Sequence, residues 1–436
     1  MTDPISDALR DTIGDQVVGR RLPRALTPFN TPAYRWLAVS LTASSFTAGV
    51  WVVALVWEVI RLGGGPADLS FVTTVGAVGV LLPALVAGVV ADRVPQRVVL
   101  VAVGLVELTG MTVVALLSSA DLSSLWVLAG VAFAIGAAMA FYYPAYSAWL
   151  PALVPESDLQ AVNGFEGMVR PTIGQAVGPA VAGAVVAAAS PASAFAVAAA
   201  SSVVTVLALL KVPQTPVRRT LDPDHAEHPV RSAVRDMREG FVYMVRTPWL
   251  LATLLFASLM VLVMMGPLEV LIPFLVKDQL GGGPSDHAYV LAGFGIGGAV
   301  GSLVMASVRM PRRYLTVQNL GWGLACLPFL LIGVATEIWV VVACAFVMGV
   351  AFAAPMVIWG TLLQRRVPPE LLGRVASLDF FVSVSLMPVS MALAGPVSDL
   401  IGLQATFAVA GTVPVVAAVV ATVWARLPQD EIAHPL

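Results

Sequence analysis

The chain has 436 residues, of which 58% are hydrophobic and only 11% are charged, and its formal net charge is −2. Soluble domains carry about 25% charged residues, so a soluble protein of this composition would leave too much apolar surface in water. The net charge is uninformative about nucleic acid, but the sequence contains no basic recognition motif, so nucleic acid is not expected as a partner. The composition predicts an integral membrane protein whose surroundings are mainly lipid.

Long apolar stretches recur along the chain, separated by charged residues, glycine or proline. A helix of about 20 residues crosses the hydrocarbon core of a bilayer, and twelve stretches have a suitable length. They cover residues 36–60, 69–90, 98–117, 124–145, 164–188, 192–210, 249–276, 288–308, 315–335, 338–359, 375–398 and 405–424. We therefore expect an all-α membrane protein with twelve transmembrane helices in two six-helix, pseudo-symmetric halves.

A hydrophilic stretch divides the predicted helices six and six. The expected domains are a cytoplasmic arm at 1–33, a first half at 34–210, a cytoplasmic central loop at 211–247, a second half at 248–426 and a cytoplasmic tail at 427–436. The arm carries many charges and has no apolar segment of the kind found in signal peptides. Apolar residues in the loop recur at helical spacing, which predicts an amphipathic helix at the membrane surface: Val230, Val234, Met237, Phe241 and Val245.

The basic residues are distributed unevenly between the two sides of the predicted bundle. If the N-terminus is cytoplasmic, 21 of the 24 Lys and Arg residues lie on the inner side or in the cytoplasmic loops. Only Arg61 and Lys277 fall in outer loops, and Arg170 lies within the fifth helix. Cytoplasmic segments of membrane proteins are enriched in Lys and Arg, so both termini are expected in the cytoplasm.

Short motifs recur in the two halves at a nearly constant offset. Residues 62–68 (LGGGPAD) return as residues 280–286 (LGGGPSD), 218 positions later. Residues 93–97 (RVPQR) return as residues 309–313 (RMPRR), 216 positions later. Chance reuse of Gly, Pro and Arg in short loops is the alternative explanation. Repeated halves are an architecture of secondary transporters, whose site lies near the midplane between the halves.

The loop after the second helix contains Asp92, Arg93 and Arg97, four to nine residues after Gly88. This loop resembles the signature loop of the major facilitator superfamily, although Pro95 and Gln96 depart from the usual pattern. An Asp can face the N-terminus of a neighbouring helix, and the Arg residues can pair with acids. The resemblance implies a latch that stabilises one of two conformations, formed by Asp92, Arg93, Arg97, Asp379 and Arg313. For Asp379, a structural role in its own helix is the alternative.

Three further stretches resemble parts of that superfamily. The fifth helix resembles the antiporter motif at Gly174, Gly178, Pro179 and Gly183, where close helix packing is the alternative explanation. Residues 144–155 (PAYSAWLPALVP) resemble the branch of enterobactin exporters, and residues 393–399 (LAGPVSD) resemble Tap-type multidrug efflux pumps. The resemblance implies proton-driven export of small molecules across the bacterial cytoplasmic membrane.

Acidic residues inside the predicted helices are candidates for proton coupling, because burying a charge in a membrane is costly. Glu107 lies about 15 Å along the third helix, near the midplane, where desolvation favours the neutral form. Glu269 follows a Gly-Pro break in the seventh helix, and Glu58 lies near the outer end of the first helix. Each has a structural alternative: a hydrogen bond to a neighbouring helix for Glu107, and an interfacial charge beside Arg61 for Glu58. Glu166, four residues before Arg170, favours a structural role as well.

The substrate cavity is expected between the first, fourth, seventh and tenth helices. Their aromatic and Met side chains suit an adaptable apolar site, although such residues also fill helix interfaces. The candidates are Phe46, Trp51, Phe133, Tyr142, Met264, Met265, Phe352 and Met356.

The sequence contains no Lys in a Gly-rich phosphate-binding loop, and its four His residues lie outside the predicted helices. We therefore expect no enzyme, no cofactor and no metal site. The expected partners are a small-molecule substrate, protons and the lipid bilayer, and the expected assembly is a monomer. A proton-coupled exporter of amphipathic molecules is the main hypothesis. A nutrient importer or facilitator of the same fold, and a receptor that transports nothing, are the alternatives.

Overall fold

The structure is a computed structural model that describes residues 24–155, 158–215, 229–308, 310–368, 371, 375, 378–379, 381–383 and 385–435. Every regular element among these residues is helical. Twelve helical segments are long and apolar enough to cross a membrane, from Pro32–Arg61 to Leu403–Trp424. The predicted fold class, with twelve transmembrane helices, is therefore confirmed.

The first half contains one short helix and six membrane-crossing segments. Its elements are η1 (Arg24–Asn30), α2 (Pro32–Arg61), α3 (Pro66–Arg93), α4 (Gln96–Ser119), α5 (Leu125–Leu153), α6 (Leu159–Val169), η3 (Arg170–Val177), α7 (Gly178–Ala188) and α8 (Pro191–Lys211). The second half follows the surface helix α9 (Pro229–Arg246). Its elements are α10 (Pro248–Gly266), η4 (Pro267–Leu271), α11 (Ile272–Phe274), η5 (Leu275–Gln279), α12 (Pro284–Ser307), α13 (Tyr314–Leu324), α14 (Pro328–Ile332), α15 (Ile338–Arg366), α17 (Met387–Ile401), α18 (Leu403–Trp424) and α19 (Leu427–Ala433).

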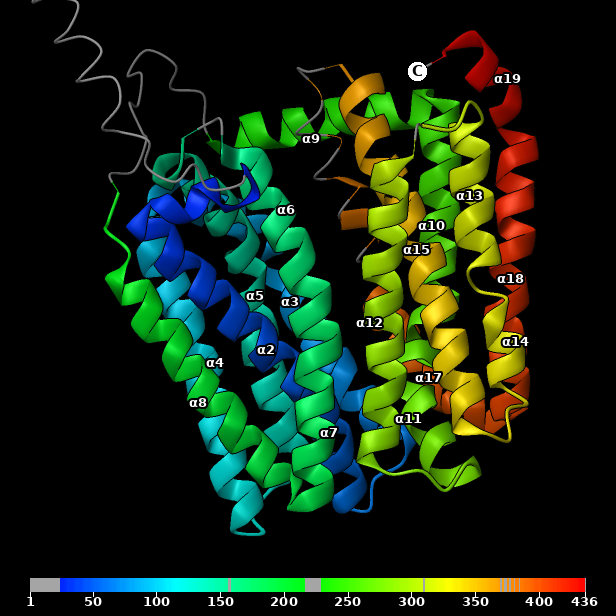
Figure 1. The fold of residues 1–436 in the computed structure, drawn as a ribbon. Helices are drawn as coiled ribbons and strands as arrows, with labels where there is room; N and C mark the ends of the chain where they lie inside the picture. Colours follow the sequence, from blue (N-terminus) through cyan, green and yellow to red (C-terminus); the bar gives the residue numbers. More distant parts are fainter. Residues whose placement is uncertain are drawn as a thin grey trace, which may run out of the picture.

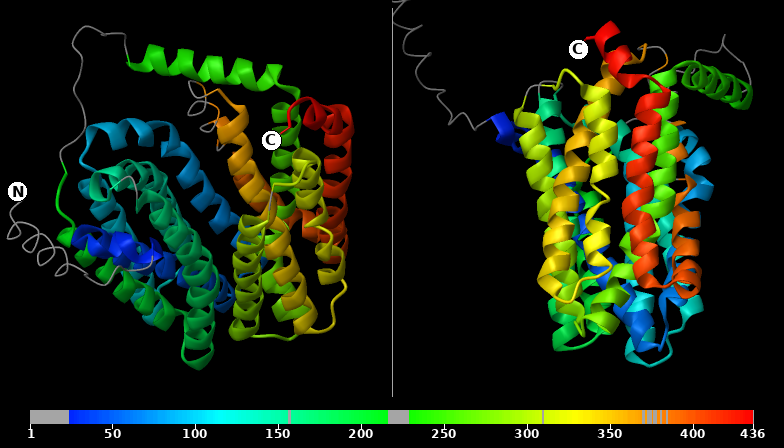
Figure 2. Two further views of the ribbon diagram at one scale, coloured as in Figure 1. Left: turned by 45° about the horizontal axis from the view of Figure 1, so that its top comes forward. Right: turned by 90° about the vertical axis from the view of Figure 1, so that its right-hand side faces the viewer.

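The two halves form separate bundles that stand side by side, as Figure 1 shows. Helix α9 lies across one end of the molecule, and α19 lies at the same end (Figures 1 and 2). We call this the α9 end and the opposite one the far end. The predicted amphipathic helix corresponds to α9, in which Phe241 and Val245 are exposed. A helix with exposed apolar side chains that lies across the end of the bundle suits the plane of the membrane surface.

The repeated glycine motifs adopt the same local structure in both halves. Gly63 and Gly281 have φ values of 79° and 62°, a region in which glycine is favoured. Three residues later the chain enters a helix, and the first-turn Asp caps it in each half. The Gly65 amide donates to Asp68 at 2.9 Å, and the Gly283 amide donates to Asp286 at 2.8 Å. The common geometry supports the repeat that the sequence predicted.

The halves are in close contact at the far end. A methyl group added to Gly395 of α17 would lie 2.7 Å from the Cα atom of Ala67 at the start of α3. The Gly395 amide donates to the Ser70 hydroxyl at 3.0 Å. A methyl group on Gly183 of α7 would likewise lie 2.6 Å from the Cβ atom of Ala288 in α12. Toward the α9 end the two bundles diverge (Figure 1).

Several predicted spans are interrupted rather than continuous. The fifth crosses as α6, η3 and α7, and the seventh crosses as α10, η4, α11 and η5. Segments η3, η4 and η5 are π-helical, and η3 and η4 begin with a proline in their first turn. Proline removes an amide donor and crowds the preceding turn, so the helix widens there. The ninth span divides into α13 and α14, and Pro328 begins the second part.

The predicted tail is a docked helix. The carboxylate of Glu431 in α19 accepts hydrogen bonds from the amide and hydroxyl of Thr316, at 2.7 Å and 3.0 Å, in the first turn of α13. Asp430 pairs with Arg366 at the end of α15. The Arg366 guanidinium also lies 4.7 Å from the ring centre of Trp249 in α10. Helix α19 thereby joins the α9 ends of α10, α13 and α15.

Replacing Glu431 with Ala is expected to destabilise the second half by about 1–3 kcal/mol, because a partly buried backbone amide loses its acceptor. The amide is that of Thr316, and the Glu431 side chain is fully buried. The midpoint of thermal unfolding of the purified protein measures the effect. Gln429→Ala, at an exposed position of the same helix, is the matched control and is expected to leave the midpoint unchanged. Equal midpoints for the two variants would contradict the role assigned to α19.

Candidate functional site

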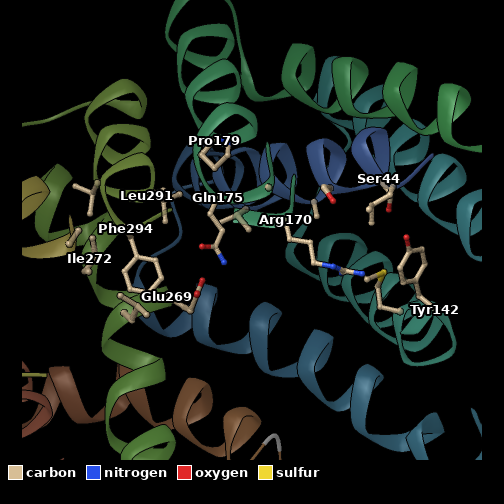
Figure 3. Close-up of a pocket in the computed structure, with 18 residues that line it drawn as sticks. Ser44, Tyr142, Arg170, Gln175, Pro179, Glu269, Ile272, Leu291 and Phe294 are labelled. Carbon is tan, nitrogen blue, oxygen red and sulfur yellow. The ribbon is translucent and has the colours of Figure 1, made fainter. Parts of the chain in front are cut away.

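A cavity of about 440 Å³ lies between the two halves. Its walls come from α2, α5, η3 and α7 of the first half, and from η4, α11, α12 and α15 of the second. Most of the lining is apolar, including Leu41, Leu268, Leu291 and Phe294. Figure 3 shows how these side chains surround the space. The volume is within the range of small-molecule sites, which are typically about 300–1,000 Å³.

Three polar side chains stand out against this apolar wall. Glu269 enters from η4, and Gln175 enters from η3 on the opposite side (Figure 3). Arg170, also on η3, extends toward Tyr142, and its Nη2 atom lies 3.8 Å from the carboxylate of Glu166. The two charges of the cavity therefore belong to different halves. A rocking motion of one half against the other changes the distance between them.

Glu269 has no hydrogen-bond or ion-pair partner among the residues that the structure describes. Its carboxylate is partly accessible only because it faces the cavity. A carboxylate in apolar surroundings without a cation is costly, so it binds either a proton or a cationic group. The π-helical turn at Pro267–Leu271 projects this side chain from the helix. Short π-helical segments are frequent at functional sites.

Glu107 lies behind the cavity wall. It is only 4% exposed, and the hydroxyl of Ser44 lies 3.3 Å from each of its carboxylate oxygens. Ser44 itself lines the cavity. This contact is compatible with both interpretations of Glu107. The Ser44 hydroxyl can hold the carboxyl group in place, which is a structural role, or it can pass a proton to it from the cavity, which is a coupling role.

Glu58 lies in a closed ion-pair cluster near the far end. Its carboxylate is fully buried and pairs with Arg61 at 2.9 Å through both oxygens. The Ser118 hydroxyl donates to it at 2.9 Å, and Arg61 also contacts Asp121 at 2.7 Å. Glu58 does not line the cavity. The geometry favours the structural interpretation over proton coupling.

Glu58→Gln is therefore expected to destabilise the first half by about 2–3 kcal/mol. Breaking a fully buried ion pair costs about 3–5 kcal/mol, and the cost is smaller here because Arg61 is 31% exposed. Asp121→Asn is the matched control, since Asp121 is 84% exposed and Asn also tolerates its positive φ of 56°. The control is expected to cost less than about 1 kcal/mol. Thermal unfolding in detergent compares the two variants, and a larger loss in Asp121→Asn would exclude this interpretation.

The predicted latch residues are paired within their own halves. Arg97 donates to the carbonyl of Leu210, Asp379 accepts from the Trp359 indole at 3.0 Å, and Arg313 donates to the Pro428 carbonyl at 2.6 Å. Asp379 is thus held by Trp359, and the expected contact with Arg97 is not formed in this conformation. The side chains of Asp92 and Arg93 lie outside the described part of the structure. Because the halves diverge at the α9 end, Arg97 and Asp379 do not pair across them in this conformation, and the latch stays a prediction (Figure 1).

Of the eight predicted cavity residues, Tyr142 lines this cavity. The other seven do not line it. Met264 is buried inside its half, Trp51 packs on Phe195 with ring centres 5.7 Å apart, and Met356 is 61% exposed outside the cavity. Phe46, Met265 and Phe352 pack against the core, and Phe133 is 37% exposed. Apolar helices show no polar face, so their sequences do not tell which side faces a cavity.

The fifth and eighth spans contribute lining that the sequence analysis missed, including Arg170, Gln175 and Phe294. The signal for Gln175 and Arg170 was their polarity inside an apolar span. The predicted antiporter glycines explain how η3 packs so closely against α2. A methyl group on Gly178 would lie 3.0 Å from the Cα atom of Gly49 in α2, and one on Gly174 would lie 3.3 Å from the carbonyl of Ser45. Gly174, Gly178 and Pro179 pack against α2, whereas Gly183 packs against α12 of the other half.

Comparison with known proteins agrees with this architecture. Residues 24–435 match a family described as transmembrane secretion effector. The chain belongs to this family. The transmembrane secretion effectors that it matches are efflux proteins of the major facilitator superfamily. The chain is therefore a multi-pass membrane transporter of an efflux branch.

Two curated efflux proteins resemble this transmembrane secretion effector over most of their length. Macrolide efflux protein A of Streptococcus pyogenes is 24% identical over 384 residues, which is 86% of this chain and 92% of that protein. Multidrug efflux pump Tap of Mycolicibacterium fortuitum is 28% identical over 417 residues, which is 91% of this chain and 96% of that pump. The bacterial origin of both indicates the cytoplasmic membrane as the location.

Solved structures share the fold at low sequence identity. The nucleoside transporter NupG superposes with a TM-score of 0.66 and 14% identity, covering 91% of this chain and 98% of NupG. A bacterial homologue of the lysosomal transporter Spinster superposes with a TM-score of 0.66 and 15% identity, covering 92% and 98% of the two chains. Both confirm the major facilitator fold that the sequence predicted.

Proposed function

We propose that this transporter is a proton-coupled antiporter that exports amphipathic small molecules from the cytoplasm. The observation that carries the proposal is the Glu269 carboxylate, which has no partner among the described residues and lies in a mainly apolar cavity between the halves. Such a carboxylate can hold a proton or the cationic group of a substrate, but not both. Mutually exclusive binding at one acid is the simplest basis for exchange of a proton against a substrate.

We assign the α9 end to the cytoplasm. The asymmetry of Lys and Arg supports this assignment, and the described residues Arg238, Arg246, Arg366 and Arg426 all lie in or next to elements at that end. The halves are closed at the far end and diverge at the α9 end. The conformation is then inward-facing, which is the state that receives a substrate from the cytoplasm.

The apolar lining favours an exporter over an importer of sugars or anions. A site for a polar nutrient would need several hydrogen-bonding groups to replace water. Here twelve of the eighteen lining residues are apolar or glycine, and the other six are Ser44, Ser45, Tyr142, Arg170, Gln175 and Glu269. The two efflux relatives, whose names refer to macrolides and to multiple drugs, support the same choice.

Proton movement in proteoliposomes tests the proposal. The full-length protein is reconstituted with a pH-sensitive dye, and a lipophilic cationic antibiotic is added at the side of the α9 end. Exchange predicts proton movement opposite to the movement of the antibiotic, and no movement with empty liposomes. Antibiotic uptake that does not depend on a pH gradient would identify a facilitator. Absence of both uptake and proton movement, in protein that unfolds cooperatively, would reject the proposed function.

A further inference from the structure

A second hollow lies on the outer surface of the second half, away from the cavity between the halves. It has a volume of about 480 Å³ and runs between α10 and α18. The right-hand view of Figure 2 shows these two helices side by side. The lining side chains include Leu255, Leu259, Val416 and Val420, and Thr412 is the only hydroxyl among them. That hydroxyl is already used, since it donates to the Ala408 carbonyl at 2.7 Å.

This groove opens toward lipid and extends to the α9 end. Trp424, the last residue of α18, lines it and is 61% exposed. Exposed Trp side chains prefer the level of the lipid headgroups. The groove therefore begins at the headgroup level and continues along α10 and α18 into the apolar layer. Its shape and composition suit a hydrocarbon chain.

Two arginines flank the groove at its α9 end. Arg246 is the last residue of α9, two positions before α10 begins, and Arg426 follows the end of α18 by two positions. Both are exposed, and neither has a hydrogen-bond or ion-pair partner for its guanidinium within the described chain. Two other arginines at this end are paired: Arg366 pairs with Asp430, and Arg313 lies 3.8 Å from Glu431.

Helix α9 holds this site at the membrane surface. Of its described apolar side chains, Phe241, Val242 and Val245 are exposed and Met244 is buried, and Arg238 and Arg246 are exposed as well. A helix of this kind lies in the interface with its apolar face in the acyl region and its basic residues near the phosphates. Arg246 is thus placed at headgroup depth directly beside the start of α10.

We propose that the groove between α10 and α18 binds one anionic phospholipid. One acyl chain lies along Leu255, Leu259, Val416 and Val420, and Arg246 and Arg426 supply the positive charge for the headgroup. The charge of the two free arginines selects an anionic lipid over a zwitterionic one. The site is independent of the transport cavity and does not require that the proposed function be correct.

Native mass spectrometry of the full-length protein tests this inference. The protein is delipidated in detergent and titrated with phosphatidylglycerol or phosphatidylcholine of identical acyl chains. A basic residue near an anionic lipid surface contributes about 1 kcal/mol, which is roughly a fivefold change in affinity. Wild-type protein is expected to retain one phosphatidylglycerol more strongly than phosphatidylcholine. Arg246→Gln and Arg426→Gln are each expected to weaken that preference by about fivefold.

Two further variants locate the lipid. Arg312→Gln removes an exposed arginine at the start of α13, away from the groove, and is expected to leave the preference unchanged. Leu255→Trp fills the groove from a position that is 56% exposed, so it threatens folding little, and is expected to abolish retention of the single lipid. Equal retention of the two lipids by wild type would overturn the inference, as would an unchanged preference in the Arg246→Gln/Arg426→Gln double variant. A cooperative melting transition confirms that each variant is folded.

Discussion

Glu269→Gln is expected to abolish pH-driven accumulation of a cationic substrate and to weaken its binding. Gln keeps the size of the side chain, but it cannot exchange a proton and offers no negative charge to the substrate. A gradient of one pH unit corresponds to about 1.4 kcal/mol, so exchange of one proton for one monovalent cation sustains roughly a tenfold concentration ratio. The variant is expected to reach a ratio of about one, because equilibration without coupling has no driving force. Uptake of a fluorescent substrate into inverted vesicles under an imposed pH gradient measures this ratio.

The controls separate three outcomes. Asp399→Asn removes an exposed carboxylate in α17 and is expected to behave as wild type. Glu107→Gln tests the acid behind Ser44, which the cavity reaches only through that hydroxyl. If Glu107→Gln abolishes substrate accumulation and Glu269→Gln does not, Glu107 is the coupling acid and the assignment to Glu269 is wrong. If both variants still accumulate substrate, neither acid carries the coupling.

Gly183→Val combined with Gly395→Val is expected to shift the protein out of the inward-facing conformation. Each added side chain would overlap atoms of the opposite half: 2.6 Å from Ala288 at Gly183, and 2.7 Å from Ala67 at Gly395. Overpacking a tight contact costs about 1–3 kcal/mol, so the two substitutions together destabilise far-end closure by about 2–6 kcal/mol. Moving a two-state equilibrium from 1:99 to 99:1 takes about 5.5 kcal/mol. The double variant therefore approaches a complete change of state.

Cysteine labelling measures that shift. Ala48→Cys places a thiol in the cavity wall, and the native Cys326 and Cys344 are buried, so the background is low. A membrane-impermeant thiol reagent is expected to label Ala48→Cys from the α9 side in an otherwise wild-type chain. In the double glycine variant, labelling from the far side is expected instead. Gly130→Val is the control, because a methyl group there meets no atom within 4 Å. Labelling from the α9 side alone in the double variant would show that these contacts do not control the conformation.

Sequence reasoning predicted the fold well because its signals are local. Apolar length determines a transmembrane helix, and an Asp three residues after a glycine caps one; Asp68 and Asp286 do so in both halves. Breaks also follow from local chemistry, as at Gly266 and Pro267, which precede the π-helical turn that carries Glu269. This reasoning did not predict that the turn is π-helical, because a π-helix depends on the packing around the proline.

The candidate site was predicted less well, because it depends on which side of each helix faces the cavity. A transmembrane helix is apolar on the lipid side and on the protein side alike, so Met356 and Leu268 look equivalent in the sequence. Only Leu268 lines the cavity. The charged residues predicted the cavity better, because a charge inside a membrane is costly and is therefore found mainly where it has a function. Glu269 was predicted as a coupling acid and lines the cavity, whereas Arg170 was noted without being assigned to it.

Docking of α19 also constrains how the protein is made. The amide of Thr316 is bound by a carboxylate 115 residues later in the chain, and Arg366 pairs with an acid 64 residues later. Domains begin to fold during synthesis, with N-terminal parts ahead of later ones. The first half can therefore insert and pack while the ribosome is still translating the second. Until α19 emerges, the nascent second half exposes an uncapped helix start and an unpaired arginine at its membrane surface. Membrane chaperones and proteases that survey newly inserted chains can recognise such groups, so docking of α19 removes two signals of an incompletely folded second half.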